Sequence, residues 1–153
     1  MAAHMNSISL VIAGFSIRLF SDHEIQLEDG YLPFVETRDV AEPDFTVHCI
    51  EHMSGIDLDA SDLLFQAEND FQKFYSVYST GSQLAFVIYN QQTNNEIQQI
   101  AFLDESFKHW TVHCEIVNDL FLPLRYPMGP IIMHYITLKT NAVMMHASCA
   151  FDG

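Results

Sequence analysis

Four runs rich in aromatic and β-branched residues follow one another in the middle of the chain, and they constrain the fold more than any other feature. They cover residues 74–80, 83–89, 97–103 and 110–117. The first two are separated only by Gly81-Ser82, and a two-residue link that begins with glycine is typical of a tight hairpin turn. We therefore expect an antiparallel meander, in which alternate side chains such as Tyr75 and Val77 face the core.

Two further segments before the meander show the alternation of a half-buried strand. Residues 7–20 are expected to form one strand, and Gly14 within it indicates a bulge or a close approach of another backbone. Residues 45–50 are expected to form a second strand, with Phe45, Val47 and Cys49 on one side. Residues 59–69 place Ser and Asp ahead of an apolar group, a pattern compatible with a short helix.

The character of the sequence changes after Asp119, where three prolines cluster at 123, 127 and 130. The apolar positions from 131 to 138 approximate a helical stripe, and Pro130 suits a first helical turn, so we expect a helix over about 130–139. The mostly apolar run 142–151 is expected to be a buried strand. The predicted fold class is α+β: mainly antiparallel sheet with one C-terminal helix and a following strand. Residues 1–4 resemble an expression scar, 5–122 a β-rich domain, and 123–153 the start of a second unit.

Composition narrows the classes of function. The chain has 153 residues, is 49% hydrophobic and carries a formal charge of −14, which argues against intrinsic disorder and against nucleic acid or an anionic membrane as the partner. Fourteen of its 20 acidic residues lie between Asp22 and Asp70, where they form either a solvated surface or a face for a basic partner or cations. The three cysteines form no C-x-x-C pair, so we expect a reducing, cytoplasmic location.

A repeated tetrapeptide suggests one metal site. Thr46-Val47-His48-Cys49 recurs as Thr111-Val112-His113-Cys114, and two His with two Cys could bind zinc if the strands were neighbours. Strand alternation would place His and Cys on opposite faces, so this site is a weak candidate. The H-x-x-E-H pattern of residues 48–52 matches inverted zinc peptidases, but residues four apart on a strand lie roughly 13 Å apart, too far to share a metal.

Two C-terminal stretches resemble a known family. Tyr126-Pro127-Met128-Gly129-Pro130 and the stretch 144–153 (MMHASCAFDG) resemble the entry to the kinase core of bacterial proteins related to HPr kinase/phosphorylase. Residues 12–18, 31–34 and 104–110 are similar to further short patterns in uncharacterised members. In that family, a helix follows the first stretch, and the second leads through a turn into a phosphate-binding loop. The resemblance implies a β-rich fold with a nucleotide site akin to that of phosphoenolpyruvate carboxykinase.

The chain departs from this family at the nucleotide site. It contains no G-x-x-x-x-G-K-[ST], so the backbone cradle, the phosphate-reaching Lys and the hydroxyl for Mg²⁺ have no counterpart. The resemblance implies ATP and Mg²⁺ for a longer parent protein, but we expect no cofactor for this chain. One site residue carries over: His146 matches the strand histidine near the nucleotide phosphates, and it is the candidate phosphate-proximal residue of the parent.

We therefore expect the non-catalytic N-terminal part of an HPr-kinase-like protein, a β-rich domain that regulates the kinase or positions its substrate. One alternative is a complete acidic protein-binding module without catalytic activity. A weaker one is a metal-binding protein that uses His48, Cys49, His113 and Cys114. We also expect self-association through the C-terminal helix or strand, because the run 142–151 would lack a hairpin partner and leave an apolar edge open.

Overall fold

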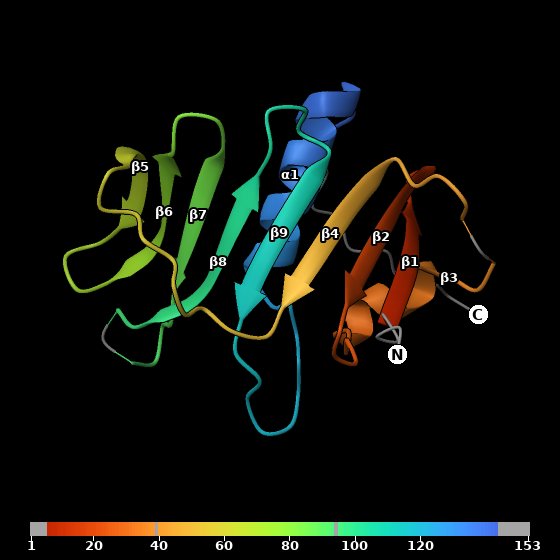
Figure 1. Cartoon of the computed structure of the whole chain (residues 1–153), viewed down its shortest axis with the longest axis horizontal. Helices are drawn as coiled ribbons and strands as arrows, with labels where there is room; N and C mark the ends of the chain where they lie inside the picture. The colour runs from red at the N-terminus through yellow and green to blue at the C-terminus, as the bar shows by residue number, and fades with distance from the viewer. Residues whose placement is uncertain (1–5, 39, 94, 144–153) are drawn as a thin grey trace, which may run out of the picture.

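In the part of the chain that the structure describes, nine strands lie side by side in one mixed sheet, and a single α-helix crosses one of its faces (Figure 1). The structure is a computed structural model that describes residues 6–38, 40–93 and 95–143. The strand order is β3-β1-β2-β4-β9-β8-β7-β6-β5. Helix α1 lies behind the middle of the sheet, so the strands at the β5 edge extend beyond it (Figure 1).

The elements have the following bounds. The first half of the chain contains β1 (Asn6–Ile12), β2 (Phe15–Ser21), the 3-10 helix η1 (Asp29–Phe34), β3 (Val35–Glu36), β4 (Phe45–Ile50) and β5 (Asp62–Glu68). The second half contains β6 (Lys73–Ser79), β7 (Leu84–Tyr89), β8 (Ile97–Leu103), β9 (His109–Cys114) and α1 (Met128–Thr140).

The antiparallel meander expected from the aromatic runs is confirmed. Strands β6, β7, β8 and β9 pair antiparallel in sequence order. The β6–β7 hairpin turns at Gly81, whose φ of 88° is the left-handed conformation that a tight turn requires. Val77 faces the core as expected, and Tyr75 packs against the same cluster.

The sheet is mixed because β4 lies between two strands that run parallel to it. It pairs with β2 on one side and with β9 on the other. After β4, the chain crosses the face of the sheet opposite α1, which we call the outer face, and reaches β5 at the far edge. The meander then returns to β9 (Figure 1). Met53, Ile56 and Leu58 of the crossing segment pack on a small second core that contains Val87 and Ile100.

Two expectations from the sequence were wrong. Residues 7–20 form a hairpin of two strands, because Ala13 and Gly14 both have positive φ, 52° and 84°, and reverse the chain. The segment expected as a short helix is strand β5. Its capping residues do not begin a helix there, because the backbone from Asp62 to Glu68 pairs with β6.

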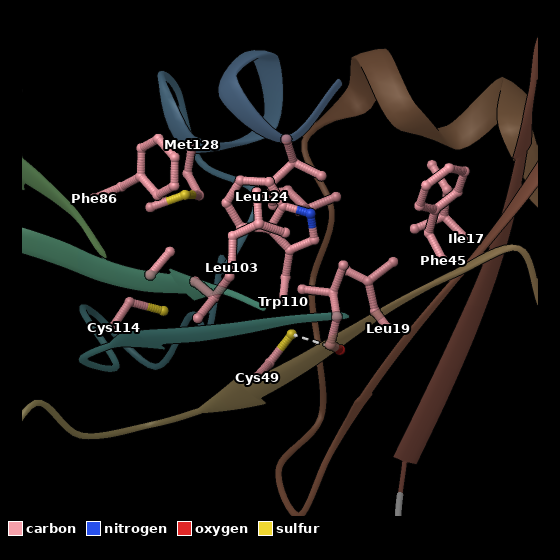
Figure 2. Close-up of a cluster of buried hydrophobic side chains, with 14 of the residues drawn as sticks. Ile17, Leu19, Phe45, Cys49, Phe86, Leu103, Trp110, Cys114, Leu124 and Met128 are labelled. Atoms are coloured by element: carbon pink, nitrogen blue, oxygen red, sulfur yellow. Dashed lines mark hydrogen bonds between the residues drawn. The ribbon is translucent and has the colours of Figure 1, made fainter. Parts of the chain in front are cut away.

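One hydrophobic core joins the helix to the sheet. Trp110 and Phe86 of the sheet lie in the same buried cluster as Met128 and Ile132 of α1 (Figure 2). The boundary expected at residues 122/123 stays a prediction, but the described part of the second segment shares this core with the first.

Helix α1 confirms the expected C-terminal helix. It ends at Thr140, and the next residue, Asn141, has the left-handed conformation (φ 55°) typical of a helix C-terminus. Ala142 and Val143 belong to no strand, and the remainder of the strand expected over 142–151 lies outside the described residues. Among the helices that the structure describes, none is both long and apolar enough to cross a membrane.

Candidate functional site

The main candidate site is a groove with a volume of about 500 Å³ on the helix-bearing face of the sheet. We call it the α1–β5 groove, because α1 and β5 form its two sides. Its lining comes from three strands and from helix α1 with the residues just before it: Leu64 and Phe65 of β5, Tyr75 and Val77 of β6, Leu84 and Phe86 of β7, and Tyr126, Pro127, Pro130, Ile131, His134 and Tyr135 around α1. The lining is thus apolar and aromatic, which is typical of a binding surface.

The floor of the groove follows from strand alternation. Val77 and Phe86 are direct cross-strand neighbours, and Tyr75 lies two residues along on the same face of β6. Val77 and Phe86 are buried in the main core, whereas Tyr75 is only partly covered. The core therefore extends as far as Val77 of β6, and the accessible part of this face is formed by Tyr75 and by the exposed residues of β5.

A bulge in β5 supplies the outer side of the groove. Leu63 pairs with Tyr78 and Phe65 with Val77, so Leu64 is the extra residue between two paired positions. A bulge places neighbouring side chains on one face, and both Leu64 and Phe65 line the groove. The two side chains are 58% and 52% exposed, and the Phe65 ring lies 5.7 Å from the Tyr75 ring.

Tyr135 anchors α1 against the sheet at the inner side of the groove. Its ring packs edge-on against Phe86 at 5.1 Å and against Trp110 at 5.9 Å. Burial, with a smaller contribution from Tyr75, raises the pKa of Tyr135 above its ordinary value. The phenol therefore stays neutral at physiological pH.

The segment that leads into α1 is held by buried polar contacts. The side-chain amide of Gln99, itself buried, donates a hydrogen bond of 2.9 Å to the carbonyl of Pro123. The backbone N–H of Phe121 donates to Oε1 of Gln26 at 2.6 Å. These contacts fix the segment before the cis Tyr126-Pro127 bond, and so they position Tyr126, which is 72% exposed at the mouth of the groove.

The structure separates the four candidate metal ligands into two pairs. Strands β4 and β9 are indeed neighbours, but Cys49 and Cys114 point into the core on the same side as Trp110 (Figure 2). His48 and His113 lie on the outer face, as the alternation predicted. No group of three or more His, Cys, Asp or Glu among the described residues is placed to hold a metal ion.

The thiols of Cys49 and Cys114 are expected to be unreactive, because both have raised pKa values. Burial, and secondarily the neighbouring Cys114, raises the pKa of Cys49 far above its ordinary value. Burial also raises the pKa of Cys114, to about 11, although a hydrogen bond with Gln99 opposes the shift. A thiol that stays protonated is a poor nucleophile and a poor metal ligand. His146 and Cys149 lie outside the described residues.

The outer-face histidines form a small cluster with aromatic neighbours. The His48 ring stacks on Phe20 at 4.8 Å, and Nδ1 of His113 lies 3.0 Å from the carbonyl oxygen of His52, to which it donates. Partial burial and the proximity of His52 and His48 lower the pKa of His113, although its hydrogen bond opposes the shift. His113 is therefore neutral at physiological pH, with Nδ1 carrying its proton.

Comparisons with protein families, with curated proteins and with solved structures found no significant match for this chain. The sequence analysis did not predict the α1–β5 groove, because residues 59–69, which include Leu63, Leu64 and Phe65, were considered compatible with a short helix. The signal that could have revealed it is the apolar run Leu63-Leu64-Phe65. On a strand, three consecutive apolar residues leave at least one exposed unless the strand is buried on both faces.

Proposed function

We propose that this chain is a non-catalytic protein-binding domain, and that the α1–β5 groove is its binding surface. The observation that carries the proposal is that exposed Leu64, Phe65 and Tyr126 surround one groove. Exposed apolar side chains gathered in one place are characteristic of interaction sites, whereas scattered ones are not. Aromatic side chains are also enriched at the centres of protein interfaces.

Helix α1 supports the same proposal. Lys139 is its only Lys, Arg, Asp or Glu, and its exposed residues are Pro130, His134, Leu138 and Lys139. The exposed side of α1 is therefore mixed, with Pro130 and Leu138 adding apolar surface that a partner could cover.

The resemblance to HPr-kinase-like proteins gives this role a context. In such a parent, we propose, the domain positions a protein substrate or regulates the kinase, while ATP and Mg²⁺ belong to the kinase core. The groove itself does not suit a nucleotide, because none of its described lining residues is Lys or Arg and no glycine-rich phosphate loop adjoins it. The helix that follows Tyr126-Pro127 agrees with this context, although many unrelated folds contain such a helix.

A random-peptide display experiment on the full chain tests the binding role. We expect enrichment of a family of peptides that compete with one another, and loss of that enrichment with the Leu64→Ser variant. Leu32→Ser is the matched control, because Leu32 is similarly exposed (54%) but lies in η1 and does not line the groove. If the native chain and Leu64→Ser enrich the same peptides to the same extent, the groove is not the binding surface.

A further inference from the structure

We propose that the α1–β5 groove binds an amphipathic helix of a partner protein, and that the polar face of this helix is basic. The helix would lie beside α1 on the same face of the sheet. This inference rests on the proposed function and names the partner's class. It is carried by the exposed apolar side chains that line the groove, by the bulges of β5 and by the charge along that edge.

The open part of the groove lies at its outer side. Phe86 of β7 and Val77 of β6 are already buried in the core, whereas Tyr75 of β6 is only partly covered. Leu64 and Phe65 of β5 are exposed and face α1 across the groove. Pro130, Ile131 and His134 of α1 would contact one side of the bound helix, and Leu64 and Phe65 the other.

The edge strand is poorly suited to the main alternative, a partner that adds a further strand. Regular pairing along β5 is interrupted twice, between Leu63 and Phe65 and between Ala67 and Glu68. Bulges at a sheet edge twist the backbone and discourage the addition of another strand. The same bulge that disturbs the edge also turns Leu64 toward the groove, so side-chain contacts are favoured over backbone pairing.

The charge along the β5 edge favours a basic partner. Asp62 and Glu68 stand at the two ends of β5 and Asp70 follows it, while Asp57 and Asp59 precede it on the segment that crosses the outer face. All five are exposed, and residues 57–70 contain no Lys or Arg. Opposite charge speeds association and selects among partners. Arg125 is exposed and precedes Tyr126, a residue of the opposite side of the groove, in the sequence. The Lys and Arg of the partner helix are therefore expected along the β5 edge.

Three fluorescein-labelled synthetic peptides test the inference. The first carries Leu and Lys at helical spacing over ~18 residues, long enough to fold on binding. The second has the same composition in strict alternation, which favours a strand. The third replaces every Lys of the first with Glu. Binding of each to the full chain is measured by fluorescence anisotropy near physiological ionic strength, since screening suppresses non-specific attraction to an acidic protein.

We expect the helical Lys peptide to bind at least about tenfold more tightly than either of the others, and Leu64→Ser to weaken it about tenfold. Leu32→Ser should leave binding unchanged. A benzophenone on the helical peptide should crosslink to residues 64–65 or 126–134, a readout that does not depend on the stability of any variant.

Several outcomes would overturn the inference. The first is that the alternating peptide or the Glu peptide binds as tightly as the helical Lys peptide, or more tightly. The second is that the benzophenone crosslinks outside the groove. The third is that the Leu64→Ser variant binds the helical Lys peptide as tightly as the native chain does. A homodimer that Leu64→Ser dissociates would assign the groove to a second copy, and would also overturn it. If displayed peptides still enrich through Leu64 while the helical peptide fails, the binding role stands and only the partner class is wrong.

Discussion

The phenolic oxygen of Tyr31 occupies the space that a side chain at Gly129 would need. An ideal β-carbon on Gly129 would lie 1.8 Å from Oη of Tyr31 and 2.8 Å from the backbone carbonyl oxygen of Leu124. Burial, and secondarily Glu28, raises the pKa of Tyr31 to about 12, so its hydroxyl remains protonated. This contact locks η1 against the first turn of α1.

The Gly129→Ala variant should therefore be destabilised. Alanine favours a helix over glycine by about 1 kcal/mol, but the Leu124 carbonyl belongs to the backbone and can move only together with the segment that carries it. We expect a net loss of about 1–3 kcal/mol in the free energy of unfolding, as in other overpacked sites. Chemical denaturation followed by Trp110 fluorescence measures this loss.

Gly30→Ala is the matched control for this prediction. A β-carbon at Gly30 would meet no atom within 4 Å, and Gly30 also lies in a helical turn of η1. Its free energy of unfolding should change by less than about 0.5 kcal/mol. Equal stability of Gly129→Ala and the native chain would show that the close approach of Tyr31 and Leu124 is not a constraint.

A second prediction concerns the buried amide that holds the segment before α1. Gln99→Leu removes the hydrogen bond to the Pro123 carbonyl, at 2.9 Å, and leaves that acceptor without its side-chain donor. We expect a loss of about 1–3 kcal/mol, measured by thermal or chemical unfolding. Gln98→Leu serves as control, because the bonds of Gln98 are longer, at 3.4 Å, and its side chain is only half-buried. A similar loss in both variants would contradict this role of Gln99.

The meander was predictable because its information is local. Each strand from β6 to β9 pairs with the next along the chain, so aromatic runs and short turns were sufficient to anticipate it. Helix α1 was predictable for the same reason, since its apolar stripe and Pro130 lie within one segment. The opposite faces of His48 and Cys49 followed from strand alternation alone.

The parts of the fold that the sequence did not predict depend on contacts between residues far apart in the chain. The parallel pairing of β4 with β2 and β9 brings Val47 beside Leu19 and Trp110, and no local pattern encodes that arrangement. Strand β5 was mistaken for a helix because Ser and Asp before an apolar run fit both structures, and pairing with β6 decides between them. The groove depends on a bulge at Leu64, and a register shift of this kind is visible only when both strands are known.

A third prediction concerns pH. The folded state lowers the pKa of His113 below its ordinary value of about 6.5, chiefly by burial. Well above that value the imidazole is neutral in both the folded and the unfolded chain, so it does not change the free energy of unfolding. As pH falls, the unfolded chain binds the proton first, so stability decreases from about pH 7 and the full penalty is reached below the folded pKa. The midpoint of thermal unfolding should therefore decrease between about pH 7.5 and about pH 5.

His113→Gln isolates this contribution. Its amide can still donate to the His52 carbonyl but cannot titrate, so the variant should lose less stability than the native chain over the same pH range. Asp44 and Asp104 do not contribute to the change in stability over this pH range. Their carboxylates have pKa values below the ordinary range, so their contribution to stability is lost only in more acidic solution. An unchanged pH dependence in His113→Gln would assign the effect to other histidines.

The last prediction is self-association through the C-terminal end of α1. Leu138 and Val143 are 58% and 82% exposed there, and pairing two copies would remove both from water. We expect a dimer by light scattering at high protein concentration. Because each copy carries a charge of −14, added salt should screen their repulsion and strengthen the dimer.

Leu138→Lys should shift this equilibrium to the monomer, because a charged side chain would have to be buried in the interface. Leu32→Lys adds the same charge at a similarly exposed position in η1, and so it controls for the change in net charge. Retention of the dimer in Leu138→Lys would place the interface elsewhere. A native chain that stays monomeric at high concentration and in high salt would contradict self-association altogether, and would leave the exposed end of α1 available to a different protein.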